Sequence, residues 1–437
     1  MIFTLDVRRA RKGDCMLLHY GTADEPALAV IDGGPAGVYE PHLKPRLLEI
    51  RNARGVGDGE QLPVDLLMVS HVDDDHIRGI LDLTKEEIDR KNAQEPRLLS
   101  VMSFWHNSFD AIIDHTPDEL TSTFTTKFGE ASAGGATLSD DALLAVEMES
   151  DAESEVVLSG LKVLASIAQG FRLRLDAEAL GYPSNPDFGG KLILAREGAG
   201  TIDVGGGLTL TVVGPLHAEL AELHEKHVEW LKQLEREGKS PESALAAYVD
   251  ESVANLSSIV VLAETEGKRM LMTGDARGDK VLEGLEMLGL LQPGGTMEVD
   301  VLKVPHHGSA NNLDDDFFER IIAHHYVFSG NGEHGNPERE ALEMLFRARG
   351  DEPLVVHLTY PVEEIDAERK KDWQAAQAKE RKKQAKKPDA KVREDWSDER
   401  HSLQGFLEQT RLAAGQEVRI VPIEEPHLIE LLEPLGF

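Results

Sequence analysis

One short stretch, residues 66–80, constrains the fold of this chain more than any other. It begins with an apolar run rich in branched side chains, which predicts a buried strand, and then changes abruptly to His71, Asp73, Asp75 and His76. His71 and Asp73 alternate onto one side, and we expect Asp75 and His76 in the tight turn behind them. Four side chains that can bind metal therefore follow the end of one strand, and this arrangement suits two adjacent divalent ions.

An acidic surface turn and a calcium loop are the alternatives for this stretch. A calcium loop of the EF-hand kind needs oxygen donors at alternating positions, followed by glycine and a distal glutamate, and Ile77 breaks that register. Companion motifs further along the chain favour a centre of histidines and carboxylates.

These motifs repeat the pattern of an apolar strand that ends in polar side chains. Residues 270–275 predict a strand that ends at Asp275 beside a glycine, and residues 301–309 predict a strand that leads into His306 and His307 and a glycine turn. At the start of the chain, strands are expected over residues 2–7, 15–20 and 27–31, and Asp32 with two glycines follows the third.

In this order the motifs resemble those of the metallo-β-lactamase fold superfamily. Its His-x-His-x-Asp-His signature corresponds to residues 71–76, with Asp73 where the second histidine usually stands. Gly13-Asp14-Cys15 and Ile31-Asp32-Gly33-Gly34 look like the opening hairpin of one branch, represented by the soluble domain of the DNA-uptake competence channel. The resemblance implies an α+β fold, a four-layer αβ/βα sandwich with helical insertions, in which ligands converge at strand ends along one edge.

The resemblance also implies a ligand set for two metal ions. Asp75, His76 and one of the two adjacent histidines would hold one ion, His71 and Asp73 the other, and Asp275 would bridge them. The expected ligands are His71, Asp73, Asp75, His76, Asp275 and His306. Asp32 would support a metal-binding histidine from behind, whereas an ordinary turn aspartate is the alternative for this position.

We expect Asp75 and His307 to act in catalysis, His307 by contacting substrate or by donating a proton to the leaving group. The superfamily's middle histidine is absent, and His106, which follows a predicted strand over residues 98–104, is a candidate to complete the first site. His334 and Asn336, in a polar loop after a later strand, are further candidates for substrate contact.

Two divalent ions are the implied cofactors, zinc first, with manganese or iron as alternatives because Asp73 makes its site harder than a histidine would. Two cations that share a water lower its pKa towards neutrality, and the hydroxide attacks carbon or phosphorus. The expected function is therefore a metal-dependent hydrolase, a phosphodiesterase or nuclease by resemblance. Hydrolysis of a small ester, lactone or amide and a non-catalytic metal-stabilised scaffold are the alternatives.

Composition narrows the class of protein. The chain has 437 residues, 41% of them hydrophobic, and it contains no apolar run long enough to span a membrane, so we expect a cytoplasmic protein with no membrane partner. A single cysteine, Cys15, excludes an internal disulfide framework. The formal net charge of -33 opposes generic adhesion to nucleic acid, although a local basic patch can reverse the sign.

Four regions are expected along the chain. Residues 1–361 would form the hydrolase domain, with a helical insertion around 115–200, and residues 401–437 would return to it. Between them, residues 362–400 predict a charged helical arm, and the basic part at 369–393 is a candidate contact for nucleic acid or protein. A solvated arm without a partner is the alternative. Substrate identity and oligomeric state stay open.

Overall fold

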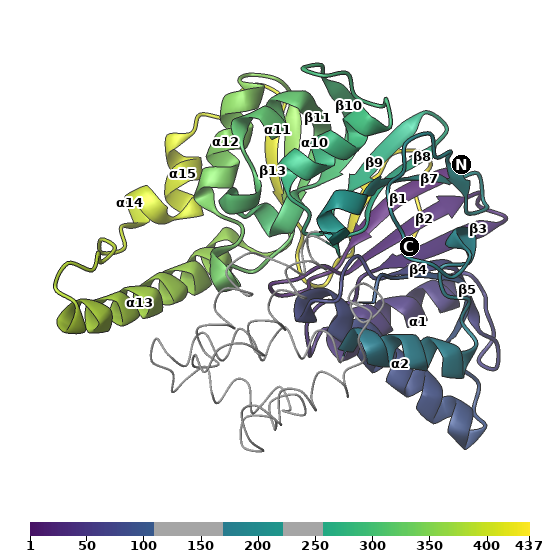
Figure 1. Ribbon diagram of the computed structural model, residues 1–437. Helices are drawn as coiled ribbons and strands as arrows, with labels where there is room; N and C mark the ends of the chain where they lie inside the picture. Colours follow the sequence, from purple (N-terminus) through teal and green to yellow (C-terminus); the bar gives the residue numbers. More distant parts are fainter. Residues whose placement is uncertain (109–168, 222–256) are drawn as a thin grey trace.

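Two β-sheets lie face to face in the computed structural model, which describes residues 1–108, 169–221 and 257–437 (Figure 1). The smaller sheet has six strands, and it is parallel from β3 to β5 and antiparallel elsewhere. In spatial order these strands are β14 (His427–Glu430), β1 (Ile2–Val7), β2 (Met16–Gly21), β3 (Pro26–Ile31), β4 (Leu62–Met68) and β5 (Leu99–Trp105).

The larger sheet has eight strands, parallel from β9 to β13 and antiparallel from β6 to β9. In spatial order they are β13 (Gln416–Ile420), β12 (Leu354–Leu358), β11 (Ile321–Phe328), β10 (Met297–Lys303), β9 (Lys268–Met272), β8 (Val260–Thr265), β7 (Thr209–Gly214) and β6 (Ile202–Asp203).

Helices cover the outer face of each sheet. Leu47 and Ile77 belong to the apolar core beneath the smaller sheet, and Val281 and Phe317 to the core above the larger one, while a third core fills the space between the sheets. The order of layers is therefore helices, sheet, sheet, helices. The helices are α1 (Lys44–Ala53), α2 (Asp74–Ala93), α10 (Gly278–Met287), α11 (Asp315–Arg320), α12 (Arg339–Arg349), α13 (Val362–Lys386), α14 (Asp398–His401) and α15 (Leu403–Gln409).

The two mixed sheets and their helices agree with the expected α+β class, and the strands predicted from apolar runs form at both halves of the chain. One expectation about the motif was wrong. Asp75 and His76 do not lie in a turn but in the first turn of α2, because Asp73 takes the extended conformation that begins a helix and the acidic side chains that follow suit a helix amino terminus.

Part of the predicted helical insertion, residues 115–168, lies outside the described residues. The rest of it contains helical residues 169–180 and then loops without a long strand. The last two strands return to the body, β13 at the edge of the larger sheet beside β12 and β14 beside β1. Within the described part of the chain, no helix is both long and apolar enough to cross a bilayer.

Candidate metal centre

The candidate centre lies where strands of both sheets end. Past the end of β4, the carbonyl oxygen of Ser70 accepts a hydrogen bond from the backbone N–H of Ile259, 2.8 Å away, which ties the smaller sheet to the chain entering β8. Asp275 follows β9, and His306 and His307 follow β10, in the larger sheet. The polar side chains therefore meet at the seam between the sheets.

Helix α2 is seated against the turn after β3 by contacts that only glycines allow. The N–H of Gly33 donates to the carbonyl of His76 over 2.8 Å, and the N–H of Gly79 donates to the carbonyl of Gly34 over 3.0 Å. A Cβ on Gly79 would lie 1.9 Å from the carbonyl oxygen of Gly33. This close approach brings the first turn of α2, with Asp75 and His76, into the centre.

His306 and His307 have an uncommon backbone. Both are in the left-handed region, with φ of 47° and 54°, and Gly308 follows at 83°. Such conformations are costly for residues other than glycine and persist only where the surroundings impose them. Here the N–H of His306 donates to the carbonyl of Gly274 over 3.1 Å, which holds the turn against the residue before Asp275.

Asp275 is the hub of the cluster, buried at 2% exposure. The Nε2 atoms of four imidazoles approach its carboxylate. His76 and His307 lie 3.2 Å and 3.4 Å from Oδ1, and His306 and His71 lie 3.6 Å and 3.8 Å from Oδ2. One carboxylate thus faces the same ring nitrogen of four histidines, a geometry suited to a bridging ligand.

Each imidazole is held by its other ring nitrogen. Nδ1 of His76 donates to Asp32, 2.9 Å away, and Nδ1 of His306 donates to the side-chain oxygen of Asn312, 2.9 Å away. Nδ1 of His71 lies 3.2 Å from the hydroxyl of Ser70. With Nδ1 engaged, a neutral ring presents the Nε2 lone pair to the centre, as metal-ligating histidines do.

Nδ1 of His307 is also held, through the hydroxyl of Ser329 and the carboxylate of Asp14. The Ser329 hydroxyl donates to Oδ1 of Asp14 over 2.5 Å, so the hydroxyl must accept from Nδ1 of His307, 2.9 Å away. Oδ2 of Asp14 lies 2.5 Å from Nζ of the buried Lys303. Asp14 is close enough to the centre to act as a ligand, but both of its oxygens already face donors. We therefore read it as the residue that orients His307.

Several buried atoms at the centre have no aligned hydrogen-bond partner among the described residues. They are Nε2 of His71, His76 and His307, Oδ1 of Asp275 and Oδ2 of Asp14. A buried polar atom without a partner costs free energy, and natural proteins leave few of them. A set of inward-facing nitrogen and oxygen lone pairs fits a divalent cation, so the donor set passes a chemical test for metal binding.

The charges of the cluster bear on metal binding, because a histidine must be deprotonated to act as a ligand. Burial lowers the pKa of His71 to about 3, and the neighbouring His76 adds to this, so its ring is neutral. Burial opposes a charge on His307, yet Asp275 and Asp14 raise its pKa to about 10. Burial likewise opposes the Asp275 carboxylate, but His307 and His76 hold its pKa well below the usual range. A metal ion binding here would displace protons from the histidines.

The structure groups the predicted ligands around His76. Asp14, His76, Asp275 and His307 form one buried group with ligand atoms within 4.8 Å of one another, and His71, Asp75 and His76 form a second. Asp73 remains at the margin, with its carboxylate 3.8 Å from His71 Nε2. Of the two adjacent histidines, the buried His307 and not the preferred His306 joins the group, and the ligand roles stay predictions.

Three further candidates lie outside these groups. The ring of the buried His106 stacks on Phe104 at a centroid distance of 4.7 Å, at the end of β5. His334 is exposed, with Nε2 3.1 Å from Nζ of Lys12. The amide of Asn336 donates to the backbone carbonyl of His306 over 3.3 Å, so it braces the histidine turn. None of the three is in a metal-like group within the described residues.

Sequence reasoning assigned no role to Asp14 or Lys303, although Asp14 was part of the quoted opening motif. The sequence signal for Asp14 was the glycine that precedes it. The structure explains this glycine, because a Cβ on Gly13 would lie 1.9 Å from the carbonyl oxygen of Asp75. Lys303 gave no signal, since a lysine at the end of an apolar strand ordinarily reaches solvent.

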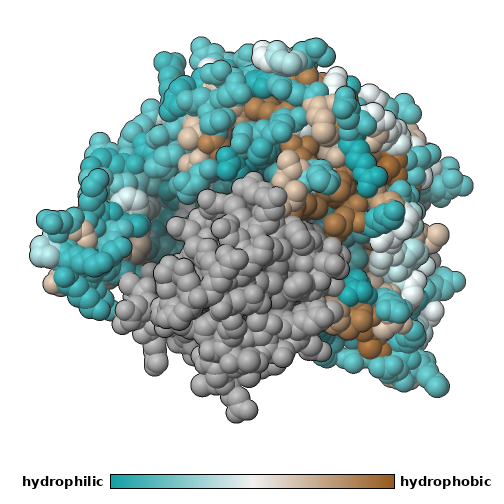
Figure 2. All heavy atoms as spheres, in the orientation of Figure 1, coloured by the Kyte–Doolittle hydropathy of each residue, from teal (hydrophilic) through white to brown (hydrophobic). Residues whose placement is uncertain are grey.

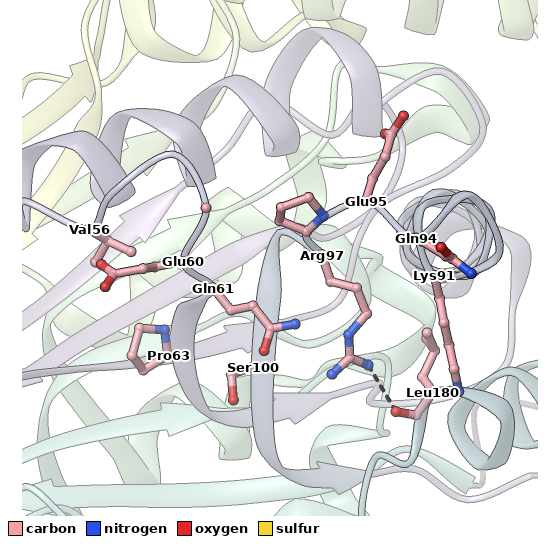
Figure 3. A pocket seen from close by; sticks show the side chains of 12 residues that line it. Val56, Glu60, Gln61, Pro63, Lys91, Gln94, Glu95, Arg97, Ser100 and Leu180 are labelled. Atoms are coloured by element: carbon pink, nitrogen blue, oxygen red, sulfur yellow. Dashed lines mark hydrogen bonds between the residues drawn. The ribbon is translucent and has the colours of Figure 1, made fainter.

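A large open cavity of about 1010 Å³ lies at the opposite end of the smaller sheet (Figure 3). Residues at the starts of β4 and β5 and at the end of α2 line it, and Arg97 there donates to the carbonyl of Leu180 over 2.9 Å. None of the predicted site residues lines this cavity. This cavity is therefore separate from the candidate centre at the seam.

Comparison with known proteins gives partial matches. No family model matches the chain. A stretch of 140 residues, 31% of this chain, is 31% identical to microtubule-associated protein 1A of Rattus norvegicus and covers 5% of that protein. A stretch of 130 residues, 29% of this chain, is 27% identical to ComE operon protein 3 of Bacillus subtilis (strain 168) and covers 15% of it. The chain thus corresponds to a small fraction of either relative's length.

Proposed function

We propose that this chain is a metal-dependent hydrolase built on a sandwich of the metallo-β-lactamase type, with a phosphodiester as its substrate. The observation that carries the proposal is the convergence of four Nε2 atoms on the buried Asp275 carboxylate at 3.2 to 3.8 Å. Buried Nε2 atoms in a merely structural cluster would be expected to have hydrogen-bond partners, yet those of His71, His76 and His307 have no aligned partner among the described residues.

In this proposal Asp275 would help to hold both ions. His76 and His307 would complete the buried side, and His71 and Asp75 the other. Divalent ions bound here would lower the pKa of a coordinated water and stabilise negative charge on the substrate. His306 is 27% exposed in its side chain while His307 is 2% exposed, so we assign substrate contact and proton donation to His306 instead of His307.

The supporting residues keep this arrangement ready before substrate arrives. Asp32 fixes the ring of His76, and Asp14, through Ser329, fixes the ring of His307. Preorganised groups need no costly rearrangement as charge develops. The nitrogen and oxygen donors contain no thiolate, which suits zinc, with manganese or iron as alternatives.

The choice of a phosphodiester has two supports. The motifs resemble the competence-channel branch of the superfamily, and part of the chain is similar to ComE operon protein 3. A small ester, lactone or amide is the alternative substrate class, because a metal site alone does not define the substrate.

The test is metal content together with hydrolysis of bis(p-nitrophenyl) phosphate by the wild type and Asp275→Asn. We expect the variant to lose bound metal and to lose turnover by a factor of at least about 100, because one oxygen ligand shared by both ions is neutralised. Asp279→Asn is the matched control, since Asp279 is an exposed residue on α10 paired with Arg277. Full metal content and turnover in Asp275→Asn would refute the proposal.

A further inference from the structure

The arm formed by α13 and the chain that returns from it carries a strong local charge of the opposite sign to the whole protein. The formal net charge of the chain is -33, yet residues 379–393 contain many more basic than acidic residues. The basic ones are Lys379, Arg381, Lys382, Lys383, Lys386, Lys387, Lys391 and Arg393, and the acidic ones are Glu380 and Asp389.

One face of α13 is used to hold the returning chain. Gln377 donates to the carbonyl of Arg393 over 3.0 Å, Arg381 pairs with Asp395 at 2.8 Å, and Gln384 donates to the carbonyl of Ala390 over 2.9 Å. These three α13 residues recur at a spacing of four and three, so they share one helical face. The arm is therefore a helix whose defined inner face holds a returning chain that is not helical.

The lysines lie on the opposite face. Lys379, Lys382, Lys383 and Lys386 follow the spacing i, i+3, i+4 and i+7, and at 100° per residue their mean direction is about 180° from the inner face. Lys382, Lys383 and Lys386 are exposed and form no ion pair with any described residue. Like charges at i, i+4 destabilise a helix by a few tenths of a kcal/mol per pair. This stripe is costly to the helix that carries it.

The arm also extends away from the acidic body. Gln377 is the last buried residue of α13, and every residue from 381 to 389 is exposed. Nine residues of helix beyond Gln377 span about 14 Å, longer than the screening length of about 8 Å at physiological salt. Figure 1 shows α13 projecting from the layered body, and Figure 2 shows a hydrophilic surface over it. The outer end of the positive stripe, at Lys386, thus lies beyond the screening length from Gln377.

The root of the arm is joined to the candidate centre. α13 starts just past the end of β12, at the same edge of the parallel strands where β10 delivers the two histidines. Arg369 of α13 donates to the carbonyl of Gly335 over 3.1 Å, in the loop whose Asn336 donates to the carbonyl of His306. The arm and the centre therefore belong to one edge of the molecule.

We infer that the lysine stripe of the arm binds the sugar–phosphate backbone of a nucleic acid. This inference rests on the proposed function, and it names nucleic acid as the phosphodiester that the centre receives. The row of ammonium groups lies opposite the face whose Gln377 and Gln384 hold the returning chain, and such a row suits phosphates and not bases, so binding is independent of sequence.

The experiment measures binding of fluorescently labelled single-stranded and duplex DNA of mixed sequence by anisotropy, in EDTA, between about 50 and 200 mM salt. The variant is Lys382→Gln with Lys383→Gln and Lys386→Gln. The control removes the same charge elsewhere, as Lys85→Gln with Lys268→Gln and Lys280→Gln, all paired surface lysines. Circular dichroism and thermal unfolding establish that both variants fold as the wild type does.

We expect the arm variant to bind at least about tenfold more weakly at the lowest salt and its slope of log K against log salt to be shallower by about 2 to 3, with the control close to wild type. Equal weakening in the control, or no binding by the wild type, would overturn the inference. So would lysine-dependent binding of phosphatidylserine vesicles without binding of DNA.

The two proposals fail separately. Binding needs no metal and is measured without turnover, whereas hydrolysis of bis(p-nitrophenyl) phosphate does not need the arm. Arm-dependent DNA binding by a protein that lacks phosphodiesterase activity would leave the arm inference standing and refute the proposed function.

Discussion

At the residue scale, the most unexpected feature of the candidate centre is a buried lysine. Nζ of Lys303 lies 2.5 Å from Asp14, donates to the carbonyl of Gly274 over 3.0 Å, and is 3.8 Å from Asp275. Its charge compensates a buried carboxylate that faces His307. The residue therefore neutralises the cluster from behind while the imidazoles face inward.

Replacing Lys303 by methionine tests this role. Lys303→Met removes one partner of a buried ion pair and leaves Asp14 uncompensated, which should lower the free energy of unfolding by about 3 to 5 kcal/mol. Urea denaturation gives the value. Lys268→Met is the control, because Lys268 pairs with Asp300 at 2.7 Å but is 38% exposed, and we expect it to cost less than about 1 kcal/mol. Equal losses in the two variants would contradict the role given to Lys303.

At the scale of elements, the packing of α2 sets how far the metal-capable residues of its first turn reach into the centre. Gly33 and Gly79 set that distance through their backbone contact. A helix interior would otherwise favour alanine over glycine by about 1 kcal/mol.

Gly79→Ala should therefore destabilise the protein instead of stabilising it. The added Cβ would overlap the Gly33 carbonyl, and the shift of α2 that relieves the overlap should cost about 1 to 3 kcal/mol and reduce metal affinity through Asp75 and His76. Thermal unfolding and metal titration measure both effects. Gly59→Ala, with no atom within 4 Å of its Cβ, should be close to neutral, and a neutral Gly79→Ala would refute the argument.

Three histidines link elements of the two sheets and belong to neither metal-like group. Nδ1 of His325 in β11 lies 3.0 Å from Nε2 of His357 in β12, and Nδ1 of His357 lies 2.8 Å from Nε2 of His427 in β14. Burial lowers the pKa of His357 to about 2. Burial also lowers the pKa of His427 to about 4, against the opposing charge of Asp6. The line is therefore neutral in the folded protein.

This line should make stability depend on pH. Between about pH 6.5 and pH 4 the unfolded chain binds a proton at His427 that the folded chain does not, so the free energy of unfolding falls as pH falls, by up to about 1.4 kcal/mol per pH unit. In His427→Gln this contribution disappears, and the pH dependence measured by urea denaturation should be less steep. His324→Gln, at an exposed position of β11, is the control; an unchanged slope in His427→Gln would count against the argument.

At the scale of the whole molecule, the candidate centre joins two sheets that otherwise meet through an apolar core. The candidate ligands come from α2 on one side and from the ends of β9 and β10 on the other. A cation bound between them would hold both halves together, so its effect should extend beyond the site.

Divalent ions should therefore stabilise the entire fold. Zinc added to protein freed of metal by EDTA, at about 100 times its dissociation constant, should raise the free energy of unfolding by about 2.7 kcal/mol. Thermal unfolding with and without zinc measures this, and Asp275→Asn should show no such increase. An identical unfolding temperature with and without zinc, manganese or iron would contradict metal binding independently of any activity.

Sequence alone was sufficient for features that depend on local patterning. Apolar runs that end near His71, Asp275 and His306 predicted strands with polar side chains at their ends. Such a prediction is possible because the period and the end of a strand depend on residues that are neighbours in the sequence. Local patterning did not reveal the first turn of α2, because the acidic residues there were taken for a tight turn. The basic arm followed from composition.

Tertiary structure decided how these side chains face one another. Which adjacent histidine turns inward depends on the left-handed backbone of His306 and His307, and the places of Asp14 and Lys303 depend on contacts between strands hundreds of residues apart. Side-chain direction at a strand end is set by backbone torsion and by sheet packing, neither of which a local pattern encodes. The sequence by itself determined which strand ends carry metal-capable side chains, and only the packing of the two sheets decided that four Nε2 atoms meet one carboxylate at the seam.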